Sequence, residues 1–434
     1  MKILESEKII GINTFLTPSV GIGGKLRYYP EDFGVVEKPI YPPEKKDGKF
    51  TIAEVTSTYW ETNLLIRELS DALRISRQRI NFAGTKDKRA KTTQIMSFYK
   101  VKTDDVSDIK IKDVEIKNVY GSDKPVKIGT LLGNKFQITI RNIKPQTTKK
   151  DIENIWSVID ENDGFPNFFG IQRFGITRPI THVVGKHIVN GDFEKAVMAY
   201  IANPIEGEGE TSFEIRKKLQ ETHNYSEALK SYPDNLNFEK AILNKLVQNP
   251  DDFASSLKEL PQNLLTMFVY AYQSYLFNKI ICERIKKRIP LNQAVEGDII
   301  LPVKNGIIED RQIPVSGRNI EKVNTQLSKQ KAVVSAVLFG TGSVFCKGEM
   351  GEIEKKIIEA EKFDPRDFII PEIPFISSSG SRRPILGFVK DFSYKLFEDE
   401  ETGKALTLNF ELLKGCYATS FLREFMKPDN IRNY

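Results

Sequence analysis

The stretch Gly84-Thr85-Lys86-Asp87-Lys88-Arg89-Ala90 is the part of the chain from which the rest can be interpreted. Between Leu64 and Lys91 there are eight Lys and Arg against three Asp and Glu, in a protein whose net charge is only +6. Asp87 lies at the centre of this positive run, and neighbouring cations favour its ionised form. An ionised Asp can act as a nucleophile or a base, and the cations would attract polyanionic nucleic acid. The alternative is a solvated loop with a local ion pair.

The residues on either side predict the elements that hold this loop. Apolar residues at helical spacing predict a helix that begins near Asn63, with Thr62 or Asn63 able to cap its start. Residues 81–83 predict a short strand that leads into the loop, and residues 93–101 predict a strand that leaves it. A loop between two strands is a rigid support for a reactive carboxylate.

A second unusual stretch covers residues 164–175, where four phenylalanines are accompanied by Asn, Gln and Arg and bracketed by glycines. Two or three of these rings are expected in a core. A ring held in such a loop can also stack on an extruded base, while the polar side chains bind the base edge or phosphates. This block is therefore the second candidate half of an active site.

Length and composition set the broad class of protein. A chain of 434 residues predicts two domains, and 40% hydrophobic with 28% charged residues is typical of a soluble globular protein. No apolar run has the length of a membrane span, and the N-terminus lacks a hydrophobic signal core, so we expect a cytoplasmic protein without membrane contact. The excess of cations suggests an acidic partner, most commonly nucleic acid.

Motifs for metals and nucleotides are missing or incomplete. The three cysteines are far apart without a CxxC pair, and His182 and His187 lack an HExxH context, so we expect no metal site. Gly21-Ile22-Gly23-Gly24-Lys25 looks like a phosphate loop, but its spacing is wrong and Leu26 stands where Ser or Thr must reach magnesium. We therefore expect no nucleotide cofactor.

Taken together, these motifs resemble the TruD family of pseudouridine synthases, the tRNA pseudouridine-13 synthases. They occur in the family's order over nearly the whole chain. The stretches that carry the resemblance are Gly23-Gly24, residues 30–33 with Glu37, 82–90, 133–136, 167–175, 273–278, 380–384, 415–419 and 422–424.

The resemblance implies an α+β fold: a pseudouridine synthase catalytic domain with a mainly antiparallel sheet, and an inserted α+β TRUD domain that clamps RNA. The expected boundaries are residues 1–175 and 377–434 for the discontinuous catalytic domain, and 176–376 for the inserted one. The alternating residues 134–143 and 406–412 predict strands of the shared sheet. The last helix is predicted to face inward with its aromatics and outward with Arg423, Glu424 and Lys427.

The resemblance also assigns roles to single residues. Asp87 corresponds to the catalytic aspartate, Phe169 to the ring that stacks on the target uracil, and Asn167 to a group that positions the base or the loop. Lys86 and Glu37 belong to the charged network beside Asp87. The family uses no cofactor, and its substrate is tRNA. The basic side chains expected to contact RNA are Arg77, Lys88, Arg89 and Arg173.

The reaction implied is the isomerisation of uridine to pseudouridine, at uridine 13. An extruded base is required, and Asp87 can either attack C1′ or remove the 2′ proton; the sequence leaves both routes open. A non-catalytic RNA-binding protein on the same scaffold is the first alternative. An aspartate-based hydrolase would need a second carboxylate, for which Glu37 is the one candidate. The oligomeric state is left open.

Overall fold

The computed structural model describes residues 3–430 and 433, which form two compact units. The sheet unit comprises Leu16–Phe165, the short piece Asn305–Ile307 and the chain from Gly387 onward. The helical unit comprises the chain up to Phe15, Pro166–Lys304 and Ile308–Leu386. These divisions differ from the boundaries expected after residues 175 and 376. Whether residues 176–376 are an inserted domain stays a prediction.

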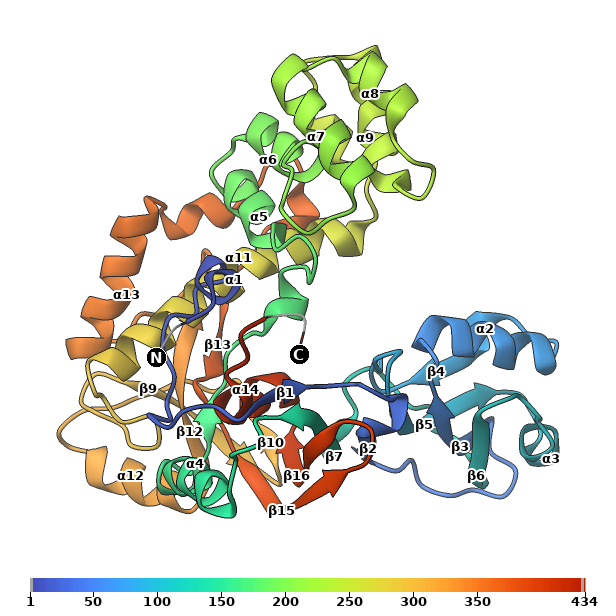
Figure 1. The fold of residues 1–434 in the computed structure, drawn as a ribbon, viewed down its shortest axis with the longest axis vertical. Helices are drawn as coiled ribbons and strands as arrows, with labels where there is room; N and C mark the ends of the chain where they lie inside the picture. The colour runs from blue at the N-terminus through green and yellow to red at the C-terminus, as the bar shows by residue number, and fades with distance from the viewer. Residues whose placement is uncertain (1–2, 431–432, 434) are drawn as a thin grey trace. The chain divides into compact units, whose positions relative to one another are not determined.

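The sheet unit is built on one large sheet (Figure 1). Its strands run in the order β15 (Val389–Asp399), β16 (Gly403–Leu413), β7 (Leu131–Ile143), β2 (Phe33–Pro39), β5 (Lys91–Tyr99), β3 (Phe50–Thr58) and β6 (Val114–Ser122), with β1 (Gly23–Lys25) on β7 and β4 (Ile80–Phe82) on β5. The pairs are antiparallel except β2 with β5, where Gly34 lies opposite Lys91 in parallel register. The α+β class with a mainly antiparallel sheet is therefore confirmed.

Alternation along β7 explains one half of this unit's core. Ile138 and Ile140 are fully buried, and they join one hydrophobic cluster with residues of β16 and of the helices α4 (Lys149–Glu161) and α14 (Ala418–Met426). On the same cluster Trp156 of α4 stacks on Phe392 of β15 with 3.8 Å between ring centroids. The last segment of the chain thus completes the sheet that β2 and β7 begin.

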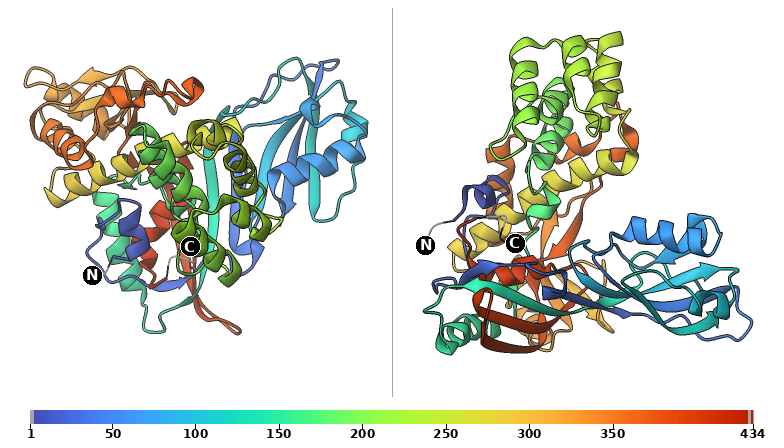
Figure 2. Two further views of the ribbon diagram at one scale, coloured as in Figure 1. Left: turned by 90° about the horizontal axis from the view of Figure 1, so that it is seen from above. Right: turned by 45° about the vertical axis from the view of Figure 1, so that its right-hand side comes forward.

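The other half of the sheet carries a second cluster, made by β3, β5 and the helix α2 (Thr62–Ala72). Leu65 and Leu69 of α2 are buried in it together with Phe98 of β5. Both views of Figure 2 show α2, in blue, lying along the strands of this half. The short helix α3 (Thr103–Ser107) contributes Val106 to the same cluster.

The predicted cap of α2 was wrong. The N-cap is Glu61, whose side chain accepts the N–H of Leu64. Thr62, which was expected to cap, instead accepts the backbone N–H of Lys86 at 2.8 Å. The Thr62 hydroxyl could have accepted an N–H at the start of its own helix. It instead holds the backbone of the loop that contains Asp87.

The prediction that Arg423 and Glu424 of α14 face outward was also wrong, because both are buried. The carboxylate of Glu424 accepts the backbone N–H groups of Leu16 and Thr17, and its other oxygen pairs with Arg423 at 3.3 Å. A buried carboxylate is tolerated when it is hydrogen-bonded and paired in this way. Glu424 therefore fixes the incoming chain at Thr17 to the last helix.

The helical unit contains a group of helices that Figures 1 and 2 show in green and yellow-green. They are α5 (Thr181–Val189), α6 (Phe193–Ile201), α7 (Glu210–Thr222), α8 (Tyr225–Ser231), α9 (Asn237–Gln248) and α10 (Phe253–Leu257). The long helix α11 (Gln262–Lys286) packs against α5, α13 (Gly348–Glu361) and the strand β12 (Ala332–Leu338). A smaller sheet has the order β10 (Ile307–Ile308), β9 (Ile299–Lys304), β12 (Ala332–Leu338) and β13 (Ser381–Pro384), with β11 (Ile313–Pro314) on β9.

The remaining elements are short. They are α1 (Glu5–Ile9), α12 (Ile320–Ser328), the 3₁₀ turns Pro30–Asp32, Arg77–Arg79, Ile171–Arg173, Pro365–Phe368 and Pro374–Ile376, and the paired strands β8 (Phe165–Pro166) and β14 (Leu386–Gly387).

Candidate active site

The loop between β4 and β5 presents Asp87 to solvent. Its side chain is 60% exposed, and one carboxylate oxygen accepts Nη2 of Arg27 at 2.8 Å. Arg27 itself is only 12% exposed, and its guanidinium carbon lies 4.0 Å from the ring centroid of Phe33. Arg89 donates to the backbone oxygen of Arg27 at 2.8 Å. An accessible carboxylate is thus oriented by a cation that the protein holds in place.

Lys86, the residue before Asp87, is buried, unlike Asp87. Its ammonium binds Glu37 at 2.7 Å and the carbonyl oxygen of Gly84 at 3.1 Å, with the side chains of Lys86 and Glu37 exposed by 9% and 1%. The second oxygen of Glu37 lies 3.5 Å from the backbone nitrogen of Ile95 on β5. Lys86, adjacent to Asp87 in sequence, therefore forms a buried ion pair with Glu37, and the role of both residues in the reaction stays a prediction.

The other cations of the loop remain accessible. Lys88 is exposed, with its ammonium 5.1 Å from the ring centroid of Tyr59, and Arg77 is exposed in the 3₁₀ turn before β4. Arg79, by contrast, donates to the backbone oxygens of Tyr99 and Lys100. Exposed cations can bind phosphates, whereas the guanidinium of Arg79 makes backbone hydrogen bonds that stabilise the fold.

Phe169 and Asn167 belong to the helical unit. The backbone of Phe169 is held on both sides by Asn278 of α11, which accepts its N–H at 2.9 Å and donates to its oxygen at 3.0 Å. Asn167 is 2% exposed, and its amide accepts from Arg383 at 2.9 Å and donates to the Pro384 oxygen at 3.2 Å.

The rings of this stretch are more buried than expected. All four phenylalanines, including Phe169, are 5% exposed or less. The guanidinium carbon of Arg383 lies 4.0 Å from the Phe169 ring centroid, and Phe277 meets the same ring edge to face at 5.5 Å. One part of the Phe169 ring is therefore already covered by a cation.

Phe169 also lines a cavity of about 410 Å³ within the helical unit. Arg173 contributes to its wall, with its guanidinium carbon 5.8 Å from the Phe169 ring and 6.0 Å from the ring of Tyr270. The remaining wall comes from Leu338, from the polar side chains of Gln273 and Ser274, and from the serine-rich turn at residues 377–381. A cation, an aromatic ring and hydroxyl groups are a combination suited to a nucleotide.

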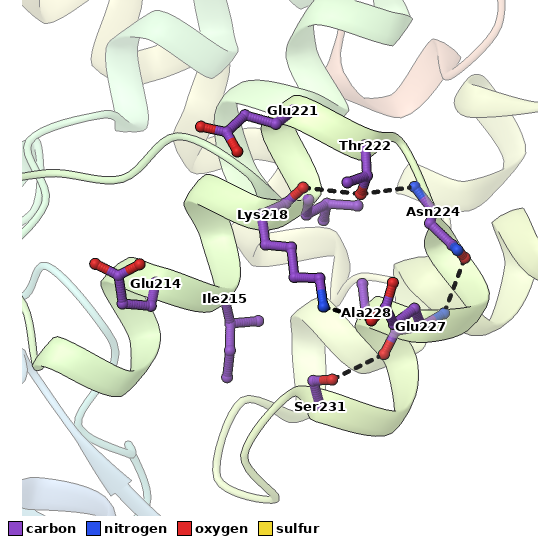
Figure 3. A pocket seen from close by; sticks show the side chains of 10 residues that line it. Glu214, Ile215, Lys218, Glu221, Thr222, Asn224, Glu227, Ala228 and Ser231 are labelled. Atoms are coloured by element: carbon purple, nitrogen blue, oxygen red, sulfur yellow. Dashed lines mark hydrogen bonds and ion pairs between the residues drawn. The ribbon is translucent and has the colours of Figure 1, made fainter.

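A further cavity, of about 470 Å³, lies between α7 and α8 (Figure 3). Its polar side chains bond to one another: Lys218 pairs with Glu227, and Asn224 accepts the Glu227 N–H at 3.1 Å. These groups cap and link the two helices. We therefore assign the cavity no part in the reaction.

Sequence reasoning missed three residues that support the predicted ones. Arg27 is a single cation in a loop, Arg383 lies in a basic turn that received no role, and Asn278 lies in a helix interpreted as aromatic core. The stretches 273–278 and 380–384, which carry the family resemblance, were the available signals for Asn278 and Arg383. The pairing of each residue with its partner depends on the fold.

The described residues include no helix long and apolar enough to cross a membrane. Among them, no group of three or more His, Cys, Asp and Glu is arranged to hold a metal ion.

Comparison with known proteins gives consistent matches. The family model of tRNA pseudouridine synthase D (TruD) matches residues 9–425. A protein from Methanococcoides burtonii named probable tRNA pseudouridine synthase D is 46% identical over 98% of both chains, and one from Methanosarcina acetivorans is 42% identical over 100% of this chain and 99% of its own. A crystal structure of a tRNA pseudouridine synthase D from Methanosarcina mazei superimposes with a TM-score of 0.90 at 42% identity, covering 100% of both chains.

Proposed function

Because the chain belongs to the tRNA pseudouridine synthase D family and is thus a tRNA pseudouridine synthase, an isomerase, we propose that it acts on uridine 13 of tRNA with Asp87 as the reacting carboxylate. The observation that carries this proposal is the geometry at Asp87. Its carboxylate is 60% exposed and oriented by Arg27 at 2.8 Å, while the adjacent Lys86 is neutralised by Glu37.

The isomerisation of uridine requires an accessible carboxylate with a fixed orientation. The N1–C1′ bond of uridine breaks, the uracil turns, and a C5–C1′ bond forms with loss of the C5 proton. A carboxylate near the ribose can attack C1′ while the electron pair of N1–C1′ leaves with uracil, and it is displaced when C5 attacks C1′. Alternatively, it removes the 2′ proton as N1–C1′ breaks and returns a proton to C2′ when C5–C1′ forms. In both routes N1 takes up a proton. In either route the carboxylate must be accessible and fixed in direction, which the contact with Arg27 supplies.

We propose that Phe169 stacks on the target uracil and that Asn167 positions the loop. A π-face makes no directional hydrogen bond, so a stacked base can still turn, and one stack is worth about 1–3 kcal/mol. The contacts of Asn167 with Arg383 and Pro384 favour loop positioning over direct base contact. The charged Lys86–Glu37 pair is proposed to support the loop below Asp87.

RNA binding is proposed for Arg77, Lys88, Arg89 and Arg173. The first three are exposed in the sheet unit, and Arg173 lines the cavity beside Phe169. Residues 1–175 and 377–434 are proposed as the catalytic domain and residues 176–376 as an inserted domain that grips RNA. Cations placed in this way suit phosphate contacts, which fix position without reading sequence.

The decisive measurement is tritium release from a tRNA transcript labelled at C5 of uridine, with no cofactor added. Forming C5–C1′ must expel the C5 hydrogen, so the wild type should release tritium. Asp87→Ala should abolish release and leave RNA affinity within several-fold in filter binding, because one carboxylate in a basic surface contributes little attraction. Mapping pseudouridine in the product locates the position.

A transcript with uridine 13 replaced by cytidine is the matched control for the site. Tritium release that persists with this transcript would overturn position 13, and release by Asp87→Ala would overturn its catalytic role. Binding of tRNA without any release would favour a non-catalytic RNA-binding protein. A large loss of RNA affinity in Asp87→Ala would point to a structural role for this residue.

A further inference from the structure

One apolar side chain of the sheet unit stands out by its exposure. Ile128 is 80% exposed, more than any other large apolar side chain in the part of the chain that the structure describes. It lies in the turn Lys127–Thr130, between β6 and β7. Two residues earlier, Val126 is 2% exposed and belongs to a core cluster, so the chain turns sharply from the interior to solvent.

This turn is rigid. The N–H of Thr130 donates to the Lys127 oxygen at 3.0 Å, and the hydroxyl of Thr130 accepts the Lys127 N–H at 3.0 Å. Gly129 has φ +83°, the value that a type II turn requires at its third position, where glycine is favoured. Ile128 therefore occupies the second position of a well-formed turn and projects from a fixed backbone.

The turn is bonded directly to the base of the Asp87 loop. The N–H of Gly129 donates to the backbone oxygen of Ala83 at 2.7 Å, and Ala83 immediately precedes the residues 84–90 that contain Asp87. On its other side, Lys414 donates to the Gly129 oxygen at 2.8 Å. The two segments therefore share one hydrogen-bonded framework, and Ile128 keeps a set position beside the loop.

The surroundings of Ile128 suit nucleic acid better than an apolar protein partner. Lys127 and Lys414 are both exposed next to it, so the isoleucine is flanked by cations that can bind phosphates. Ile40, whose N–H donates to the Thr130 oxygen at 3.4 Å, is 43% exposed, about half the exposure of Ile128. In RNA, stacked bases are bordered by a phosphate backbone. The aliphatic side chain of Ile128 can contact the bases while the lysines on either side contact the phosphates.

We propose that Ile128 is a wedge that enters the RNA stack at the place vacated by the target uridine and holds that uridine in its extruded position. This inference rests on the proposed function, since only an enzyme that extrudes a base needs such a wedge. Extrusion leaves a gap whose neighbouring bases have lost stacking contacts. Proteins that unstack nucleic acids commonly insert Ile, Leu, Phe or Met between bases. A side chain on a rigid turn does so without first losing backbone freedom.

The test compares two RNA hairpins that differ at one position. In the first, the target uridine is paired with adenosine; in the second, the opposite nucleotide is removed, so that the uridine is already bulged. We expect Ile128→Ala to lower the ratio of kcat/KM on the paired RNA to kcat/KM on the bulged RNA by about tenfold, because only the paired RNA needs help to open. Ile128→Leu should keep the wild-type ratio.

Two controls distinguish this wedge from a general loss of activity. Ile369→Ala, at an isoleucine of the helical unit that is 55% exposed, should leave the ratio unchanged. A 2-aminopurine placed 3′ of the target uridine reports its unstacking by fluorescence, and the increase on binding should be smaller with Ile128→Ala than with wild type.

Several outcomes would overturn the wedge. These are an unchanged ratio with Ile128→Ala, an equal loss on both hairpins, or a concentration-dependent self-association in sedimentation that Ile128→Ala removes, which would make this turn a contact between copies of the chain. If the wild type isomerises neither hairpin nor tRNA, the proposed function itself fails, and that result is distinct from a failure of the wedge alone.

Discussion

The ion pair between Arg27 and Asp87 and the pair between Lys86 and Glu37 have different energetic roles. Lys86 and Glu37 are buried, so removing either partner would leave an uncompensated charge at a cost of about 3–5 kcal/mol. Asp87 is 60% exposed, and an exposed pair of this kind is worth about 1 kcal/mol or less. The first pair therefore holds the loop, and the second orients a carboxylate with little effect on stability.

This difference gives a prediction for Arg27. Arg27→Ala should lower kcat by about 10- to 100-fold, because a carboxylate that is free to rotate is displaced from its productive position. Arg27→Lys should lower kcat by a smaller factor, since an ammonium can still pair with Asp87 but cannot also cover the ring of Phe33. Single-turnover tritium release measures both variants.

Arg366→Ala is the matched control for Arg27→Ala, since Arg366 also pairs with an aspartate, Asp364, but lies in the helical unit. It should keep the wild-type kcat. Wild-type turnover by Arg27→Ala would show that Asp87 needs no orienting partner.

At the level of elements, the contact between α5 and α11 depends on one glycine. A Cβ added at Gly185 would lie 2.0 Å from the backbone oxygen of Phe268, a distance that only separation of the two helices can relieve. The gain in helix propensity from alanine, about 1 kcal/mol, is smaller than the cost of overpacking, which is typically about 1–3 kcal/mol and higher against backbone.

We therefore expect Gly185→Ala to lower the unfolding free energy by about 2 kcal/mol net. Urea denaturation followed by circular dichroism measures this change. Gly317→Ala is the control, because the nearest atom to its added Cβ is a carboxylate oxygen of Glu296 at 3.7 Å, an ordinary contact. Equal stability of the Gly185 and Gly317 variants would disprove the close approach of α5 to α11.

For the whole molecule, His182 links stability to pH. Burial lowers the pKa of His182 from 6.5 to about 4, and its ring lies between Phe174 and Tyr275. Since the folded pKa is below the unfolded one, the unfolded chain binds the proton more tightly. Stability contributed by neutral His182 is complete above pH 6.5 and is lost as the pH falls toward 4.

Between pH 7 and pH 5 this residue should cost the folded state about 2 kcal/mol. The prediction compares the wild type with His182→Phe, which keeps an aromatic ring but cannot titrate. From pH 7 to pH 5, the free energy of unfolding measured in urea should fall by about 2 kcal/mol less in the variant than in the wild type. Parallel losses in the two proteins would mean that His182 is protonated without cost.

The uneven charge of the molecule predicts how tRNA binding responds to salt. Lys88→Ala and Arg77→Ala should each weaken binding and reduce the slope of log affinity against log salt by about 0.7–0.9, the value for one phosphate contact. Filter-binding titrations from low to high salt measure the slope. Lys117→Ala, at an exposed lysine of β6 that pairs with Glu115, is the matched control. An unchanged slope removes the mutated residue from the RNA footprint.

The sequence by itself determined the local elements and the segments that carry chemistry. Alternation predicted the strand at residues 134–143, and helical periodicity predicted α2. The motifs around Asp87 and Phe169 identified the family. Each of these signals depends only on residues that are close together in the chain. Spacing could not predict partners. Arg27 meets Asp87 sixty residues away, and Glu37 meets Lys86 forty-nine residues away.

The folded chain makes both contacts, and of the two only the association of Lys86 with Glu37 was implied by the family resemblance. The parallel register of β2 with β5 brings together two strands that are not consecutive, and Glu37 of β2 thereby comes within reach of Lys86. Tertiary structure also decided the contacts of Thr62, whose hydroxyl accepts the N–H of Lys86 instead of capping its own helix. Glu424 is buried because the N–H groups of Leu16 and Thr17 donate to its carboxylate. A polar side chain becomes buried or exposed according to partners that only the folded chain brings within reach.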